Sequence, residues 1–88
     1  MSEAAATLKD PVKRRVGLKQ VRRALAATEA ETLFAARYAD QRLLAPLMHM
    51  AEEQGVPVAW VDTMRELGKA CGIQTGAAIA AALRDINP

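Results

Sequence analysis

Apolar residues recur at helical spacing directly after the first glycine of the chain. Leu18, Val21 and Leu25 stand at positions i, i+3 and i+7, which places their side chains on one face of a helix. This pattern predicts a helix from Gly17 to about Thr28 with the three side chains buried. The polar residues between them are expected to face solvent.

A second stretch with helical spacing lies between two residues that typically end helices. Asp40 favours the N-cap position and Gly55 the position just after a C-terminus, where a left-handed backbone is common. Between them, apolar residues repeat at intervals of three and four, at Leu43, Leu44, Leu47, Met48 and Ala51. A third, shorter helix is predicted from the capping box of Thr63 and Glu66 to about residue 71.

Extended segments alternate with these helices. Val12–Val16 is predicted to be a short edge strand, Glu31–Arg37 a buried strand, and Val56–Val61 a strand buried on both faces. Gly76–Leu83 is rich in alanine, which favours a helix. An α/β alternation that has ended its helix at Gly72 needs a further strand, so a non-helical strand is predicted there.

The chain of 88 residues is long enough for one core but not for two. We expect residues 1–11 to be a flexible or briefly helical segment that ends at Pro11, and residues 12–88 to be a single α/β domain. A stretch of about 18 apolar residues, which a membrane span requires, does not occur, and the apolar run of a signal peptide is missing. The single cysteine fits a reducing compartment. A cytoplasmic protein without membrane contact is therefore expected.

Basic residues are concentrated near the N-terminus. Of the twelve lysines and arginines, seven precede residue 24, where only Glu3 and Asp10 oppose them. This asymmetry fits a polyanionic partner such as nucleic acid, although a basic tail that only keeps the protein soluble has the same pattern. With aromatic residues at 3%, a platform that stacks several unpaired bases is not expected.

The residues that commonly carry catalysis are few. His49 is the only histidine and lies within a predicted helix, where a structural role is favoured. Cys71 has no base near it in sequence, and Glu52 and Glu53 diverge by about 100° around a helix. No metal site, cofactor site or enzymatic activity is predicted.

The first turns of the helix after Gly17 present the strongest binding pattern. Lys19, Gln20 and Arg23 lie within one turn of one another on its outer face, beside the free N–H groups of the helix start. Such a spot suits a phosphate and a base edge together. The alternative is an ordinary solvated helix face, on which the same residue types are common.

Three segments together resemble the L7Ae family of kink-turn RNA-binding proteins. Its small bacterial members have a strand, a glycine-led helix with Lys-Gln, and a basic residue three positions later, which correspond to Gly17, Lys19, Gln20 and Arg23. They also have a Val-Pro strand and a Leu-Gly-basic-Ala-Cys-Gly-Val/Ile segment, which correspond to residues 56–61 and 67–73. The turn around Asp40 departs from the family pattern, because Tyr38 replaces an acid and Gln41 a proline.

The resemblance implies a three-layer α/β/α sandwich around a small four-stranded mixed sheet. It also implies that the helix start and the loop after the third helix lie side by side and grip a bent RNA. In that arrangement Lys19, Gln20 and Arg23 would enter the groove at sheared G·A pairs. Ile73, expected to be exposed, would pack with Gln74 and Thr75 against an extruded nucleotide.

The expected function is therefore RNA binding without catalysis. The chain would act as a monomer on structured RNA of the kink-turn type, as a ribosomal protein or in another ribonucleoprotein. The rival interpretation is a protein-interaction or ribosome-assembly module on the same fold.

Overall fold

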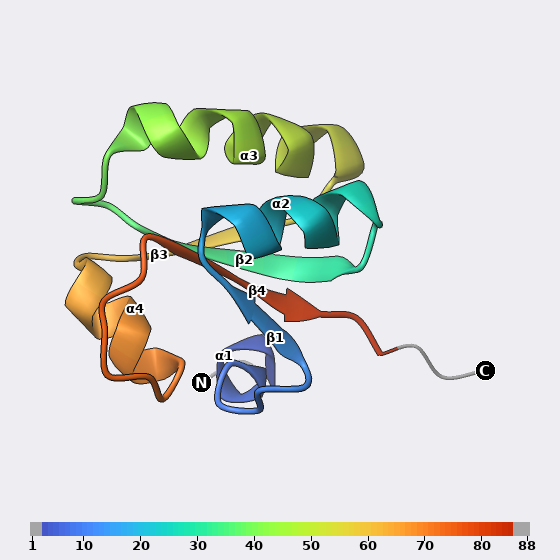
Figure 1. The fold of residues 1–88 in the computed structure, drawn as a ribbon. Helices are drawn as coiled ribbons and strands as arrows, with labels where there is room; N and C mark the ends of the chain where they lie inside the picture. Colours follow the sequence, from blue (N-terminus) through green and yellow to red (C-terminus); the bar gives the residue numbers. More distant parts are fainter. Residues whose placement is uncertain (1–2, 86–88) are drawn as a thin grey trace.

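A four-stranded mixed sheet lies between two layers of helices (Figure 1). The computed structural model describes residues 3–85. In chain order, the elements of this part are α1 (Glu3–Thr7), β1 (Arg14–Val16), α2 (Leu18–Ala26), β2 (Ala30–Ala36), α3 (Gln41–Gln54), β3 (Val58–Val61), α4 (Met64–Ala70) and β4 (Ile79–Leu83). The predicted three-layer α/β/α architecture is confirmed.

The last of these strands occupies a central place in the sheet. The strand order is β1-β4-β2-β3, in which β4 runs antiparallel to both of its neighbours and β2 runs parallel to β3. The prediction of a strand in the alanine-rich segment is confirmed for Ile79–Leu83. The small side chains suit this place because helices cover both faces of the strand, and the four residues from Ile79 to Ala82 are all buried.

Helices α2 and α3 cover one face of the sheet (Figure 1). Their apolar side chains pack with those of the strands into a core that includes Val21, Leu25, Leu33, Leu44 and Ile79. The Gln54 side-chain amide donates a hydrogen bond of 2.7 Å to the backbone carbonyl of Leu25 and ties the C-terminal ends of the two helices together. The predicted buried face of α2 is thus confirmed, with Leu18 half-buried at its start.

Helices α1 and α4 lie on the opposite face and enclose a second core (Figure 1). Its buried residues include Leu8, Phe34, Leu67 and Cys71. Leu8 follows α1 directly and is 0% exposed, so the residues before Pro11 contribute a side chain to the core. The boundary between a flexible segment and a domain at residue 12 stays a prediction.

Strand β3 is not buried on both faces, as its apolar sequence had indicated. It lies at the edge of the sheet, where Ala59 and Trp60 are exposed, the latter by 40%. The sequence pattern was misleading because a short apolar run predicts a strand but does not distinguish an edge strand from a central one.

The predicted helix ends at Asp40 and Gly55 have the expected caps, and the predicted capping box of Thr63 and Glu66 forms in part. The Asp40 carboxylate accepts a hydrogen bond of 3.0 Å from the backbone N–H of Arg42, and Gly55 ends α3 in the left-handed region with φ of 70°. The Thr63 hydroxyl accepts a hydrogen bond of 3.1 Å from the backbone N–H of Glu66 at the start of α4.

Candidate functional site

The residue before α2 is hydrogen-bonded to the first residue of strand β4. The backbone N–H of Gly17 donates a hydrogen bond of 3.0 Å to the carbonyl of Ile79, and its carbonyl accepts from the N–H of Val21 at 3.0 Å. Gly17 has φ of 96°, a conformation that residues with a side chain rarely adopt. Because glycine has no side chain, Gly17 cannot accept a hydrogen bond from the first N–H groups of the helix as a capping side chain would.

The polar residues predicted to bind RNA on this helix are exposed, as their spacing indicated. Lys19, Gln20 and Arg23 all face solvent. Helix α2 is flanked by two hollows, which these residues line or border on different sides. Gln20 and Arg23 line one of them, and Lys19 borders the other.

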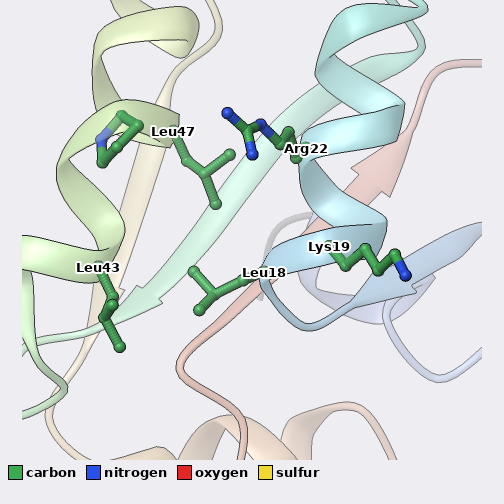
Figure 2. Close-up of a pocket in the computed structure, with 6 residues that line it drawn as sticks. Leu18, Lys19, Arg22, Leu43 and Leu47 are labelled. Carbon is green, nitrogen blue, oxygen red and sulfur yellow. The ribbon is translucent and has the colours of Figure 1, made fainter.

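The hollow beside Lys19 is an apolar groove between α2 and α3, with a volume of about 410 Å³. Its walls are Leu18, Leu43, Pro46 and Leu47, with Lys19 and Arg22 at its border. Figure 2 shows the Arg22 side chain extending toward α3, whereas that of Lys19 extends away from it. Leu43 is 58% exposed in this groove.

The hollow on the other side of α2 is more polar and has a volume of about 220 Å³. Gln20, Arg23 and Ala24 of α2 line it together with Arg15 of β1 and Glu29, which follows α2. Arg15 was not among the residues proposed from the sequence. Strand alternation could have indicated it, because β1 leads directly into α2 and successive side chains of a strand point to opposite faces.

The loop after α4 runs back along that helix. The backbone N–H of Ile73 donates to the carbonyl of Gly68 at 3.1 Å, and the N–H of Ala77 donates to the carbonyl of Met64 at 2.9 Å. Gly68 is buried against Thr75, and a side chain at this position would overlap the Thr75 carbonyl. These contacts place residues 73–77 along the length of α4.

Ile73 is half-buried, not exposed as the sequence had indicated. Its side chain packs against the core cluster that contains Leu67 and Cys71, because the loop returns along α4 instead of projecting from it. Gln74 and Thr75 are exposed. The loop leads into β4, which begins at Ile79 (Figure 1). Because the Gly17 N–H donates to the Ile79 carbonyl, this hydrogen bond connects the end of the loop to the start of α2.

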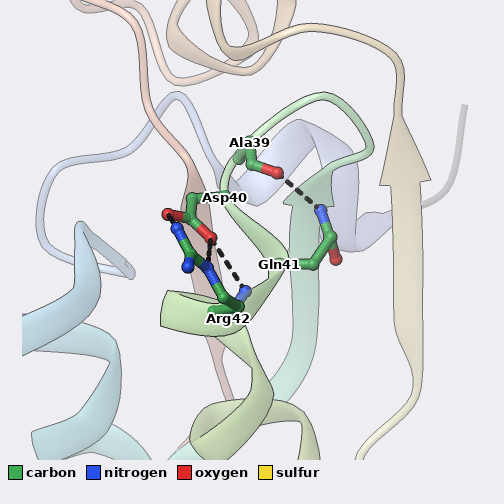
Figure 3. Close-up of polar contacts among 4 residues, drawn as sticks. All are labelled: Ala39, Asp40, Gln41 and Arg42. Atoms are coloured by element: carbon green, nitrogen blue, oxygen red, sulfur yellow. Dashed lines mark hydrogen bonds and ion pairs between the residues drawn. The ribbon is translucent and has the colours of Figure 1, made fainter.

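The turn before α3 satisfies many of its polar groups internally (Figure 3). The Asp40 carboxylate accepts hydrogen bonds from the guanidinium and from the backbone N–H of Arg42, and these bonds lower the pKa of Asp40. The Gln41 side-chain amide donates to the carbonyls of residues 36, 37 and 39 at 3.0 to 3.1 Å. Gln41 thereby closes the turn with hydrogen bonds that a proline could not donate.

The groups with catalytic potential are separated from one another. The Nε2 atom of His49 lies 3.8 Å from the Glu53 carboxylate on the exposed face of α3. Cys71 is buried, and burial raises the pKa of its thiol, an effect that the charge of Arg14 partly opposes. Among residues 3–85, no three metal-ligating side chains come together. In the same part of the chain, each helix is too short or too polar to cross a membrane.

Comparison with known proteins identifies a family that matches nearly the whole chain and relatives that match about three quarters of it. The model of the ribosomal protein L7Ae/L30e/S12e/Gadd45 family matches residues 1–87. The RNA-binding protein YbxF of Geobacillus stearothermophilus is 46% identical over 69 residues, which are 78% of this chain and 84% of that protein. An RNA-binding protein of Bacillus pumilus is 42% identical over 66 residues, 75% of this chain and 80% of its own.

A solved structure has the same fold at low sequence identity. The 15.5kD RNA binding protein of Giardia lamblia superposes with a TM-score of 0.82 at 20% identity, covering 93% of this chain and 72% of that one. At this identity the similarity establishes the fold alone.

Proposed function

Because this chain belongs to the ribosomal protein L7Ae/L30e/S12e/Gadd45 family, we propose that it is an RNA-binding protein that recognises kink-turn RNA. It would hold a bent RNA with sheared G·A pairs between the start of α2 and the loop 73–75. We further propose that it acts without catalysis, as a monomer in the cytoplasm, and that the ribosome is one source of such RNA. The names of its relatives YbxF and the Bacillus pumilus protein, both RNA-binding proteins, support this proposal.

The observation that carries the proposal is the exposure of Lys19, Gln20 and Arg23 at a helix start that is firmly held in place. The hydrogen bond from Gly17 to Ile79 fixes this helix start relative to the loop that leads into β4. A rigid site loses little conformational entropy when it binds. The N–H groups and positive end of the helix favour a phosphate there.

Each proposed contact follows from the chemistry of its side chain. The Gln20 amide can both donate to and accept from a purine edge, and Lys19 and Arg23 can bind guanine acceptors or phosphates. In the loop, the exposed part of Ile73 offers an apolar surface to an unstacked base, and Gln74 and Thr75 offer hydrogen bonds beside it.

One observation favours the rival function, a protein-interaction or ribosome-assembly module. Leu43 is 58% exposed in the apolar groove between α2 and α3, where a protein side chain could bind. Titration against a simple kink-turn duplex separates the two functions. We expect retardation of this duplex in a gel, weaker retardation of a duplex without the G·A pairs, and loss of affinity as salt rises. Equal, weak retardation of both duplexes would contradict kink-turn recognition.

Single substitutions in α2 test the proposed base contact. Gln20→Ala should cost about 1–3 kcal/mol of binding to the kink-turn and much less for unrelated duplex. Arg23→Ala should weaken binding and, if its guanidinium meets a phosphate, lower the salt dependence by about one counterion. The dissociation constant is measured against salt for each variant.

Arg22→Ala is the matched control, since Arg22 extends toward α3 and borders the other hollow (Figure 2). Equal, purely electrostatic losses at positions 20, 22 and 23 would indicate only a nonspecific basic face. The proposed role of this helix would then be withdrawn.

The loop is tested by Ile73→Asp. A carboxylate at this position would repel the RNA, so affinity should fall at least as much as for Gln20→Ala, on the order of 1–3 kcal/mol. Because Ile73 is half-buried, the free energy of unfolding should fall as well, and binding is measured on protein shown to be folded by circular dichroism. Unchanged affinity of the folded variant would exclude the loop from the interface.

A further inference from the structure

We infer that the hollow between β1 and α2, lined by Arg15, Gln20 and Arg23, binds a phosphate of the RNA backbone. This inference rests on the proposed function, and it adds a strand residue to an interface so far built from a helix and a loop. Its ligand is a single phosphodiester group next to the base that Gln20 contacts.

Arg15 is held in position within the protein itself. Its Nη1 atom donates a hydrogen bond of 2.7 Å to the carbonyl of Arg14 and a longer one of 3.4 Å to the carbonyl of Val12. Within residues 3–85, both of its hydrogen bonds come from Nη1, which leaves the donors of Nε and Nη2 for an anion. A guanidinium that is already oriented loses little side-chain entropy when it binds a phosphate.

Two side chains of α2 line the same hollow as Arg15. Arg23 brings a second guanidinium and Gln20 an amide, one helical turn apart on the same side of the helix. The buried Ala24 also lines the hollow, and its small side chain occupies little of that space. The arrangement therefore offers the hydrogen-bond donors of two cations to one anion, a combination that favours phosphate, and leaves the Gln20 amide for the neighbouring base.

Glu29 is the one acidic residue that lines this hollow. Its backbone is fixed on both sides, since its N–H donates to the carbonyl of Ala24 at 2.9 Å and its carbonyl accepts from the N–H of Arg84 at 2.9 Å. Among the described residues, neither Arg15 nor Arg23 forms an ion pair with it within 4.0 Å. The two arginines are therefore available to an external anion, and the Glu29 carboxylate should weaken that anion's binding.

The neighbouring residue in β1 provides a matched control. Arg14 precedes Arg15 in the strand, so its side chain points to the opposite face of the sheet. Its charge acts on Cys71, which lies in the core on the side of α4. Arg14→Gln and Arg15→Gln remove the same charge from adjacent positions, but only the second alters the hollow beside α2.

The experiment measures the dissociation constant of the full chain for the kink-turn duplex over a range of salt concentrations. We expect Arg15→Gln to weaken binding about tenfold and to lower the salt dependence by about one counterion. Arg14→Gln should change the affinity less than about twofold, and Glu29→Gln should tighten binding because it removes a carboxylate from beside the phosphate. Circular dichroism and urea unfolding establish that each variant is folded.

Neutral methylphosphonate linkages, placed one at a time in the RNA, identify the phosphate. At one linkage the wild-type protein should lose affinity, while Arg15→Gln should lose clearly less, because one of the two guanidinium partners of that phosphate is already absent. The inference would be overturned if Arg14→Gln and Arg15→Gln weakened binding equally. It would also be overturned if no methylphosphonate linkage affected the wild-type protein more than Arg15→Gln. If Arg15→Gln has no effect while Gln20→Ala abolishes discrimination, the inference fails and the proposed function stands. If none of these variants changes kink-turn binding, both fail.

Discussion

Replacing Gly68 by alanine should destabilise the protein by about 3 kcal/mol or more, at the upper end of the cost of overpacking. A methyl group at this position would overlap the carbonyl oxygen of Thr75, and a backbone group cannot rotate away as a flexible side chain can. Either α4 or the loop must therefore move from its place on the second core. The free energy of unfolding in urea measures the effect.

Gly55→Ala is the reference for this substitution. Gly55 has φ of 70° but no atom near the position of an added methyl group, so alanine there meets backbone strain without a clash. Gly55→Ala should therefore lower the free energy of unfolding by about 1 kcal/mol. A similar cost for both variants would show that the contact between α4 and the loop can relax. The same comparison tests the loop as an RNA-binding element, because the folded Gly68→Ala variant should also bind the kink-turn more weakly.

Leu8→Ala should lower the free energy of unfolding by about 2–4 kcal/mol, the usual cost of removing a buried leucine side chain. Leu8 is 0% exposed and packs with Phe34, Leu67 and Cys71 beneath the sheet. Helix α1 has only five residues, so Leu8 is the main apolar attachment of this segment. Denaturant unfolding monitored by circular dichroism provides the measurement.

The control is Val12→Ala, which removes an apolar side chain that is 77% exposed. Its effect should remain within about 0.5 kcal/mol. If Leu8→Ala is equally neutral, residues 1–11 are a flexible segment in solution and the domain begins at residue 12. If it is costly, the domain includes α1, and a chain shortened to residue 12 would lose part of its core.

Most of the elements could be predicted from the sequence because their signals are local. The helix ends at Asp40, Gly55 and Thr63 depend on side chains or backbone conformations within a few residues, and these predictions are confirmed. Strand β4 needed an argument from topology. Its alanines favour a helix locally, but burial between two helical layers overrides that preference.

The incorrect predictions concern properties that depend on distant parts of the chain. Whether β3 lies at the edge of the sheet depends on where β4 is inserted, which the sequence of β3 does not encode. Ile73 is half-buried because its loop folds back along α4. Leu8 was missed because one apolar residue among alanines has no periodicity, and its burial depends on the whole underside of the sheet.

The candidate site was predictable in its residue types but not in its full extent. The spacing of Lys19, Gln20 and Arg23 correctly indicated their exposure on α2. It did not indicate that α2 is flanked by two hollows, with Lys19 at one and Gln20 and Arg23 at the other. It also did not indicate that Arg15 lines the hollow of Gln20 and Arg23. The hollow beside Arg15 arises from the packing of α2 against β1, and the groove on the other side arises from its packing against α3, which is more distant in the sequence.

The central position of β4 determines the order in which this protein can fold during synthesis. Strand β1 pairs with β4, whose residues 79–83 are synthesised after residues 14–16 and after every other strand of the sheet. Before that, only the parallel pair of β2 and β3 can form a sheet, with α3 as its crossover helix. The β2 edge that receives β4 stays open during this interval and could pair with another chain. Folding of the complete sheet is therefore expected to follow translation of β4, at a rate limited by closure of the long loop between β1 and β4.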